Sequence, residues 1–325
     1  MTNVLVPLII VLAIVALVQI TRVSELLGEL KKIDVNNVTE EDNNTQGFLF
    51  VFIGGAFLIF VVWQMLEWNH LLLPPASSMH GEKIDGLMQF TMGLILVVFF
   101  LLTPILFFFA YKYRGRKENR AYYYPHNNKL ELIWTIVPTI VLTGVIIYGL
   151  KTWDNVMNVD TSDAHEIEVF SKQFQWLARE SGEDKVLGAS NFKLIDATNN
   201  LGVDMNDSNS LDDKIIREVH LVVDKPVLLK FRSQDVIHSA FLPHFRVQMN
   251  CVPGLSTQFA FTPTQTTKEM KIQEGEDFDY VLLCNKICGA AHYNMQMKFI
   301  VETQQEYDAW IASQKTLDEK LLTQK

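Results

Sequence analysis

Two cysteines, a histidine and a methionine lie within twelve residues of one another in the last quarter of this 325-residue chain. They are Cys284, Cys288, His292 and Met295, and a further histidine, His238, stands earlier in the sequence. Thiolate, imidazole and thioether form a soft ligand set that favours copper, whereas a structural zinc site seldom uses methionine. The pattern therefore predicts a copper site.

The second thiolate decides which kind of copper site is expected. A mononuclear blue-copper site uses two histidines, one cysteine and a weak axial methionine, so this set has one thiolate too many. Cys284 and Cys288 are four residues apart and can direct both sulfurs into one space, where they could bridge two copper ions that share one electron. Taken alone, the cysteine pair is compatible with a disulfide or two buried thiols, and Met295 with a core residue.

Four apolar stretches precede these residues. Each is 17 to 24 residues long, close to the ~20 residues that a helix needs to cross a bilayer. The sequence predicts transmembrane helices over 4–20, 48–66, 87–110 and 130–150. The first stretch lacks the basic leading segment and the cleavage motif of a signal peptide, so we expect a retained helix.

Charges next to these stretches predict the orientation of the chain. The segment between the third and fourth stretches contains six basic residues: Lys112, Arg114, Arg116, Lys117, Arg120 and Lys129. Cytoplasmic loops carry such an excess, so the large C-terminal half is expected on the outer side. Glu131 lies at the cytoplasmic edge of the fourth stretch, where a carboxylate is costly and marks a functional candidate; the alternative is a solvated acid at a helix end.

The second half of the chain has the composition of an acidic soluble domain. Residues 151–325 contain 18 Lys and Arg against 26 Asp and Glu, a net charge of −8. This balance argues against nucleic acid as a partner and favours a basic protein. The absence of a Cys-x-x-Cys-His motif from the sequence excludes a covalently attached c-type haem.

Apolar and β-branched residues alternate in several segments of this half. The segments are 165–176, 219–231, 256–262, 278–284 and 296–302, and Pro, Gly, Asn and Asp clusters separate them. This spacing predicts a β-sandwich or barrel. The polar segment 181–215 is expected to be an exposed excursion, and the charged tail 314–325 a solvated end.

At the candidate ligands the sequence resembles the subunit II family of cytochrome c oxidases. The family motif Ser-x-Asp-Val-x-His-Ser is matched at 233–239, and Cys-x-Glu-x-Cys-Gly-x-x-His-x-x-Met is matched at 284–295 except at Lys286. The resemblance runs from about residue 90 to 310. It includes the helix motif at 131–138, the Pro-x-Phe and Pro-Gly segment at 243–254, and the closing Tyr-Asp-Ala-Trp at 307–310.

The resemblance implies a fold and a ligand set. It implies transmembrane α-helices followed by an all-β cupredoxin sandwich: two additional helices in 1–86, the family's helical hairpin in 87–152, the copper domain in 153–313 and a charged tail in 314–325. It also implies a binuclear copper centre of the CuA type, in which Cys284 and Cys288 bridge two copper ions. His238 would bind one ion and His292 the other. Met295 would be a weak ligand, and the backbone carbonyl of Lys286 would complete the set.

The resemblance further implies a function. Electrons from cytochrome c would reach the copper pair and pass to haem a in subunit I, which reduces O₂ to water and pumps protons. The expected partners are subunit I, other oxidase subunits, cytochrome c and membrane lipid. The expected location is the bacterial inner (cytoplasmic) membrane, with the C-terminal domain in the periplasm. Glu131 aligns with the family's acid at the mouth of a proton channel.

Three segments depart from the family pattern. Lys286 replaces a glutamate whose carboxylate usually binds a magnesium ion shared with subunit I, and an ammonium cannot ligate Mg²⁺, so the magnesium is in doubt. The segment 173–176 reads Gln-Phe-Gln-Trp where the family has Gln-Trp-Tyr-Trp, which makes Phe174 and Trp176 the candidate rings for electron acceptance. The segment 248–250 reads Gln-Met-Asn where the family often has Lys-x-Asp.

Three other classes of protein share part of this pattern. A quinol oxidase subunit II has the same fold but lacks the copper ligands. A membrane-tethered copper carrier would need a copper site and an anchor but no oxidase partner. A nitrous oxide reductase would need a large further catalytic domain, which 325 residues do not provide.

Overall fold

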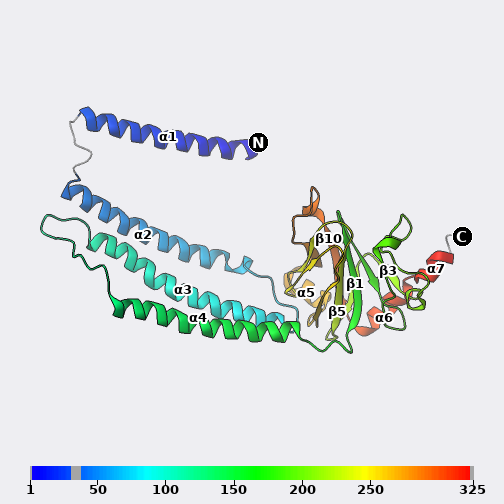
Figure 1. Cartoon of the computed structure of the whole chain (residues 1–325). Coiled ribbons are helices and arrows are strands. Elements are labelled where there is room, and N and C mark those ends of the chain that lie inside the picture. Colours follow the sequence, from blue (N-terminus) through cyan, green and yellow to red (C-terminus); the bar gives the residue numbers. More distant parts are fainter. Residues whose placement is uncertain (1, 31–37, 323–325) are drawn as a thin grey trace. The chain divides into compact units, whose positions relative to one another are not determined.

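Four long helices and a β-rich domain make up the chain (Figure 1). The structure, a computed structural model, describes residues 2–30 and 38–322. All four predicted transmembrane helices are confirmed, and each is long and apolar enough to cross a membrane. They are α1 (Thr2–Leu30), α2 (Glu40–Trp68), α3 (Gly81–Lys112) and α4 (Asn128–Met157). Each exceeds its predicted apolar stretch because polar turns extend its ends.

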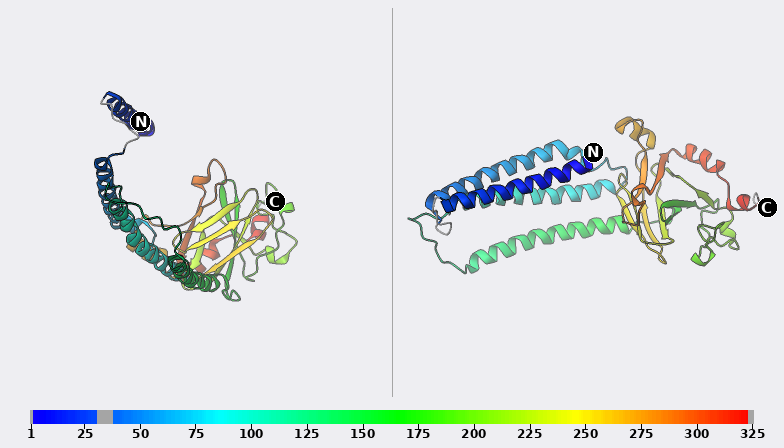
Figure 2. Two further views of the ribbon diagram at one scale, coloured as in Figure 1. Left: turned by 60° about the vertical axis from the view of Figure 1, so that its left-hand side comes forward. Right: turned by 90° about the horizontal axis from the view of Figure 1, so that it is seen from above.

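The chain forms two compact units, Met1–Leu66 with Val97–Asn127, and Glu67–Leu96 with Asn128–Lys325. In the first unit, α2 runs beside α3 (Figure 2). A Cβ atom at Gly54 would lie 2.3 Å from the Phe107 ring, so glycine is what permits this close approach of the two helices.

The second unit contains a sandwich of two five-stranded sheets, which confirms the predicted β-sandwich. Aliphatic, aromatic and methionine side chains fill its core, and helix α5 (Thr267–Glu274) lies beside it (Figure 1). One sheet has the order β3-β2-β1-β5-β8. Its strands are β1 (His165–Lys172), β2 (Gln175–Glu180), β3 (Lys214–Ile216), β5 (Val227–Ser233) and β8 (Thr257–Phe261).

The other sheet carries the candidate metal ligands. Its order is β4-β10-β9-β6-β7, with β4 parallel to β10 and the other pairs antiparallel. The strands are β4 (Val219–Val222), β6 (His238–Leu242), β7 (Val247–Cys251), β9 (Tyr280–Cys284) and β10 (Gln296–Glu302). Short 3-10 helices occur at Asn69–Leu71, Phe192–Leu194, Ser208–Ser210 and His292–Asn294.

Two predicted strands are wrong as single elements. Segment 165–176 forms β1 and β2, an antiparallel pair that reverses at residues 173–174. Segment 219–231 forms β4 and β5, which lie in different sheets and are joined through Asp224 with φ +58°. An apolar alternation continues through a tight turn, so the pattern alone does not show where the chain changes direction.

The segment 181–215 and the tail also differ from the prediction. Leu201 and Val203 are buried against Phe170 of β1, so the excursion folds onto the sheet through a small apolar cluster of its own. Leu317, at the start of α7 (Leu317–Leu322), completes this cluster. The first part of the tail, which follows α6 (Gln304–Ser313), therefore packs against the domain, because Leu317 is an apolar residue in a charged segment and is buried in this cluster. Residues 323–325 of the predicted tail lie outside the described residues.

Candidate metal centre

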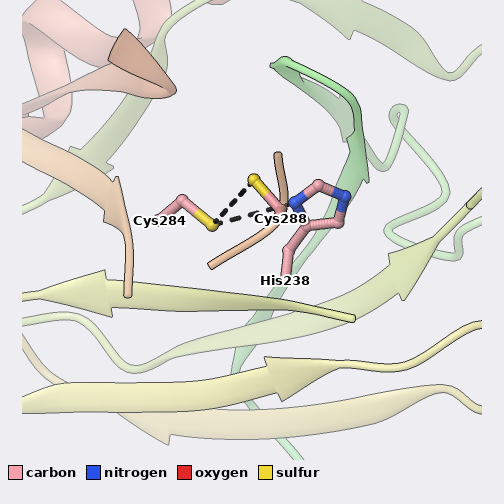
Figure 3. Close-up of side chains that lie close together, drawn as sticks. All are labelled: His238, Cys284 and Cys288. Carbon is pink, nitrogen blue, oxygen red and sulfur yellow. Dashed lines mark hydrogen bonds between the residues drawn. The ribbon is translucent and has the colours of Figure 1, made fainter. Parts of the chain in front are cut away.

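The structure brings His238, Cys284 and Cys288 together at one end of the second sheet, and all three side chains are buried. Their ligand atoms all lie within 4.8 Å of one another. The two sulfurs are 3.9 Å apart, and Cys284 Sγ is 3.7 Å from His238 Nδ1. Figure 3 shows both sulfurs and the imidazole directed toward one shared space.

Three further groups from the same loop surround this space. His292 Nδ1 lies 3.6 Å from Cys288 Sγ, and Met295 Sδ lies 3.9 Å from the same sulfur. The backbone carbonyl oxygen of Lys286 lies 3.3 Å from Cys284 Sγ. Each cysteine thus has its own imidazole, and one sulfur faces the carbonyl while the other faces the thioether.

Strand register explains how distant residues meet here. Cys284 ends β9 and His238 begins the neighbouring antiparallel strand β6, where Ala240 is paired with Cys284. Side chains alternate along a strand, so His238 shares the face of Ala240 and therefore of Cys284. Sheet pairing, rather than proximity in sequence, delivers this histidine to the cysteines.

Backbone hydrogen bonds hold the loop between β9 and β10. The Cys284 amide donates to the Met295 carbonyl at 3.2 Å, which closes the base of the loop. The Asn285 amide donates to the Ser239 carbonyl at 2.9 Å and ties the loop to β6. With both ends fixed, the positions of the two sulfurs depend on rigid strands, as a metal centre requires.

A carboxylate orients the buried imidazole. His238 Nε2 lies 2.9 Å from Asp235 Oδ1, and Nδ1 faces Cys284. Burial opposes ionisation of Asp235, but hydrogen bonds from the Gln173 amide, His238 and the Val236 amide together hold its pKa below the usual value. A carboxylate behind a histidine fixes the tautomer that a metal needs. Sequence reasoning singled out His238 but not this partner, although Asp235 lies in the same motif.

The donor set fits a soft metal. Burial first, and the neighbouring Cys284 second, raise the pKa of Cys288 to about 11, so the Cys288 thiol on its own stays protonated. A bound cation reverses this preference and favours the thiolates. A thiolate sulfur lies about 2.3 Å from a bound metal such as zinc. Half of the sulfur separation is shorter than that, so an ion on either side of the line joining the sulfurs can contact both.

Aromatic rings pack around this loop at two depths. Trp176 is buried, donates from its indole nitrogen to the Met295 carbonyl at 3.4 Å, and makes an edge contact with His238 at 6.1 Å between ring centroids. Phe174 is half-buried, and a Cβ atom at Gly289 would lie 2.7 Å from its ring. Phe174 is therefore the outer ring of the two, and Trp176 the inner.

The remaining candidates lie outside the ligand set. Glu131 is in the first turn of α4, where a negative charge interacts favourably with the helix dipole. Cys251 is fully buried in the core opposite His238, and burial raises its pKa to about 12, as expected for an inert thiol. His244 packs against Phe278 and Tyr280.

Comparison with known proteins decides the family. The description "Cytochrome C oxidase subunit II, transmembrane domain" matches residues 62–152, and "Cytochrome C oxidase subunit II, periplasmic domain" matches 199–303. The "Alternative cytochrome c oxidase subunit 2" of Bradyrhizobium diazoefficiens is 35% identical over 222 residues, 67% of this chain and 76% of the relative. The chain belongs to the cytochrome c oxidase subunit II family.

A second relative agrees with this assignment. The "Cytochrome c oxidase subunit 2" of Synechocystis is 26% identical over 283 residues, 80% of either chain. Among solved structures, the periplasmic domain of subunit II of the Bradyrhizobium japonicum cytochrome oxidase is 20% identical, with a TM-score of 0.31, over 47% of this chain and 94% of that chain. As a subunit II, the chain is part of an oxidoreductase complex with other oxidase subunits, is anchored in a membrane by helices, and has a periplasmic C-terminal domain.

Proposed function

We propose that this subunit II accepts electrons from cytochrome c at a binuclear copper centre and passes them to haem a in subunit I. The observation that carries the proposal is the pair of buried sulfurs, 3.9 Å apart, each facing a different histidine. Such a pair exceeds what one copper ion of the blue type uses. The bound copper ions would supply one-electron chemistry, and subunit I would reduce O₂ to water and pump protons.

All the proposed copper ligands are residues of this chain. Cys284 and Cys288, whose sulfurs are 3.9 Å apart, would hold both ions between them. His238 and the Lys286 carbonyl lie on the Cys284 side, while His292 and Met295 lie on the Cys288 side. Ligands held by strand ends and a doubly anchored loop move little when the charge changes, which favours rapid electron transfer.

Electron acceptance is proposed at the exposed side of the centre. Phe174 is partly exposed and its ring rests against Gly289, next to Cys288, so it is the ring that a docked donor can approach. Trp176 is buried and contacts both His238 and Met295. The net charge of −8 on residues 151–325 would attract a basic cytochrome c.

The membrane half completes the proposal. The basic segment between α3 and α4 favours a cytoplasmic position, which places the copper domain in the periplasm and the chain in the bacterial inner membrane, surrounded by lipid. Glu131, at the cytoplasmic end of α4, is proposed to take part in proton uptake by the complex.

Replacement of one bridging cysteine tests the copper assignment. In the purified complex, Cys288→Ser should remove the near-infrared absorbance of a mixed-valence copper pair and abolish cytochrome c oxidation, because a hydroxyl is a poor soft-metal ligand. Copper bound to subunit II is quantified in parallel. Cys251→Ala is the matched control, since Cys251 is a buried cysteine outside the ligand set, and it should keep both signals. One copper ion per wild-type subunit II would contradict the proposal.

A further inference from the structure

The copper loop carries a cation where the family usually has a metal-binding carboxylate. Lys286 stands between the two bridging cysteines, and the glutamate usual at this place binds a magnesium ion shared with subunit I. Magnesium requires oxygen ligands, and a lysine ammonium has three donors and no acceptor. The residues of this chain therefore do not fit that ion.

The structure separates the two ends of Lys286. Its backbone carbonyl points inward, 3.3 Å from Cys284 Sγ, and so remains available to the copper centre. Its side chain is exposed together with those of its neighbours Asn285 and Ile287. Over the described parts of the chain, 2–30 and 38–322, no carboxylate pairs with the ammonium. The acid of the neighbouring strand motif, Asp235, is already occupied by His238 and by the amides of Gln173 and Val236.

The loop that carries Lys286 also exposes two large apolar side chains. On the same loop, Ile287 and Tyr293 are each 88% exposed. Large apolar side chains this exposed next to a buried functional centre are typical of a surface that a partner covers. A partner that covers them also removes water from Lys286, and an ammonium enclosed without a counter-charge is strongly unfavourable.

We propose that this loop docks against a carboxylate of the haem-bearing partner subunit, which pairs directly with Lys286, and that no divalent cation lies at this point of the interface. The inference rests on the proposed function, since it assumes that the copper loop faces that partner. The ammonium of Lys286 then supplies the positive charge that pairs with the partner's carboxylate, in place of a bound ion.

Metal content tests the first half of the proposal. The complete complex is purified from cells grown with excess Mn²⁺, which replaces Mg²⁺ and is visible by electron paramagnetic resonance. After washing with chelator, the wild-type complex should show no stoichiometric Mn²⁺ close to the copper centre. A stoichiometric Mn²⁺ signal that is broadened by the oxidised copper pair would overturn the inference. Copper content and the near-infrared band, measured on the same sample, report separately on the proposed function.

Charge substitution tests the second half. Lys286→Glu and Lys286→Met should each weaken retention of this subunit in the complex, with the apparent dissociation constant rising about tenfold or more, because a partner carboxylate loses its counter-charge. Lys286→Arg keeps the charge and should retain association. Asn285→Asp, which adds a negative charge at the adjacent exposed position, controls for a general electrostatic effect. Copper content is measured for every variant, because the carbonyl of Lys286 faces the centre, and retention is compared only between complexes with equal copper content. Equal retention of wild type, Lys286→Met and Lys286→Glu across a salt titration would overturn the proposal.

Discussion

Gly289 adjoins the bridging cysteine Cys288 and combines two constraints. Its φ of +141° is unfavourable for other residues, and a Cβ atom there would lie 2.7 Å from the Phe174 ring. Gly289→Ala should therefore lower the stability of the periplasmic domain by roughly 1–3 kcal/mol and reduce copper retention. Thermal unfolding of the purified subunit and its copper content measure the two effects.

Two variants separate backbone strain from collision at this position. Gly254 has φ +78° with nothing within 4 Å of its would-be Cβ atom, so Gly254→Ala should show the strain without the collision. In the double variant Gly289→Ala with Phe174→Ala, the part of the loss that comes from the ring should be recovered. If Gly289→Ala and Gly254→Ala lose the same stability, the ring contact has no energetic role.

His244 should make the stability of the domain depend on pH. Burial chiefly, and the charge of Arg246 in addition, lower the pKa of His244 to about 4, while the unfolded chain has a histidine pKa of about 6.5. Between these values the unfolded state binds a proton and the folded state does not. The free energy of unfolding should therefore fall as the pH drops from about 6.5 to about 4, by roughly 1–2 kcal/mol after allowance for partial exposure.

The variant His244→Leu checks this pH dependence. It should flatten the stability curve over the same interval and leave the stability above pH 7 comparatively little changed. His80, whose pKa is lowered chiefly by burial, contributes in the same direction and accounts for a remaining slope. Identical slopes for wild type and His244→Leu in denaturant titrations at pH 7 and pH 5 would show that His244 is not the responsible group.

Arg246 is one of the residues that attach the start of α3 to the sandwich. Arg246, in the turn between β6 and β7, donates to both carboxylate oxygens of Asp85 at 2.8 Å and to the carbonyls of Pro74 and Pro243. Its side chain is only 7% exposed, against 20% for Asp85. Arg246→Ala should cost roughly 1–3 kcal/mol, less than for a fully buried pair, and make the segment before α3 more susceptible to protease.

A more exposed ion pair provides the comparison. Lys298 and Asp279 are 2.9 Å apart with side chains 43% and 34% exposed, so Lys298→Ala should cost under about 1 kcal/mol. Arg246→Lys should recover only part of the loss, because an ammonium cannot form the two parallel bonds that a guanidinium makes. Protease sensitivity that does not differ between Arg246→Ala and Lys298→Ala would contradict this role.

The elements differ in how well the sequence predicts them. The four spans follow from long apolar stretches alone, because bilayer thickness sets their length. The strand boundaries do not, since β1 and β2 share one uninterrupted pattern and reverse at residues 173–174. The cluster of Leu201, Val203 and Leu317 also cannot be predicted from a local pattern, because Leu317 lies more than a hundred residues after the other two.

The metal centre shows the same division. The loop from Cys284 to Met295 is predictable because all its soft donors are close in sequence and have one compatible chemistry. The place of His238 depends on the pairing of β6 with β9, and the role of Asp235 on a contact with His238 that three-dimensional structure reveals. That Phe174 is the outer ring and Trp176 the inner could not be predicted, since alternation along β2 does not say which neighbour covers a ring.

The proposed function assigns two processes to this chain. The copper ligands of the periplasmic domain accept electrons, and Glu131, in the first turn of α4, takes part in proton uptake. If Glu131 takes part in proton uptake, Glu131→Gln should slow turnover several-fold without changing copper content or the rate at which cytochrome c reduces the copper centre. Glutamine is as good a helix former as glutamate, and the loss of the charge at the helix N-terminus costs about 0.3–1 kcal/mol. Glu131→Asp, which keeps the carboxylate, should restore most of the turnover. Steady-state oxygen consumption and stopped-flow copper reduction on the same complexes separate the two steps, and an unchanged oxygen consumption in Glu131→Gln would leave Glu131 as a helix-end acid with no part in the reaction.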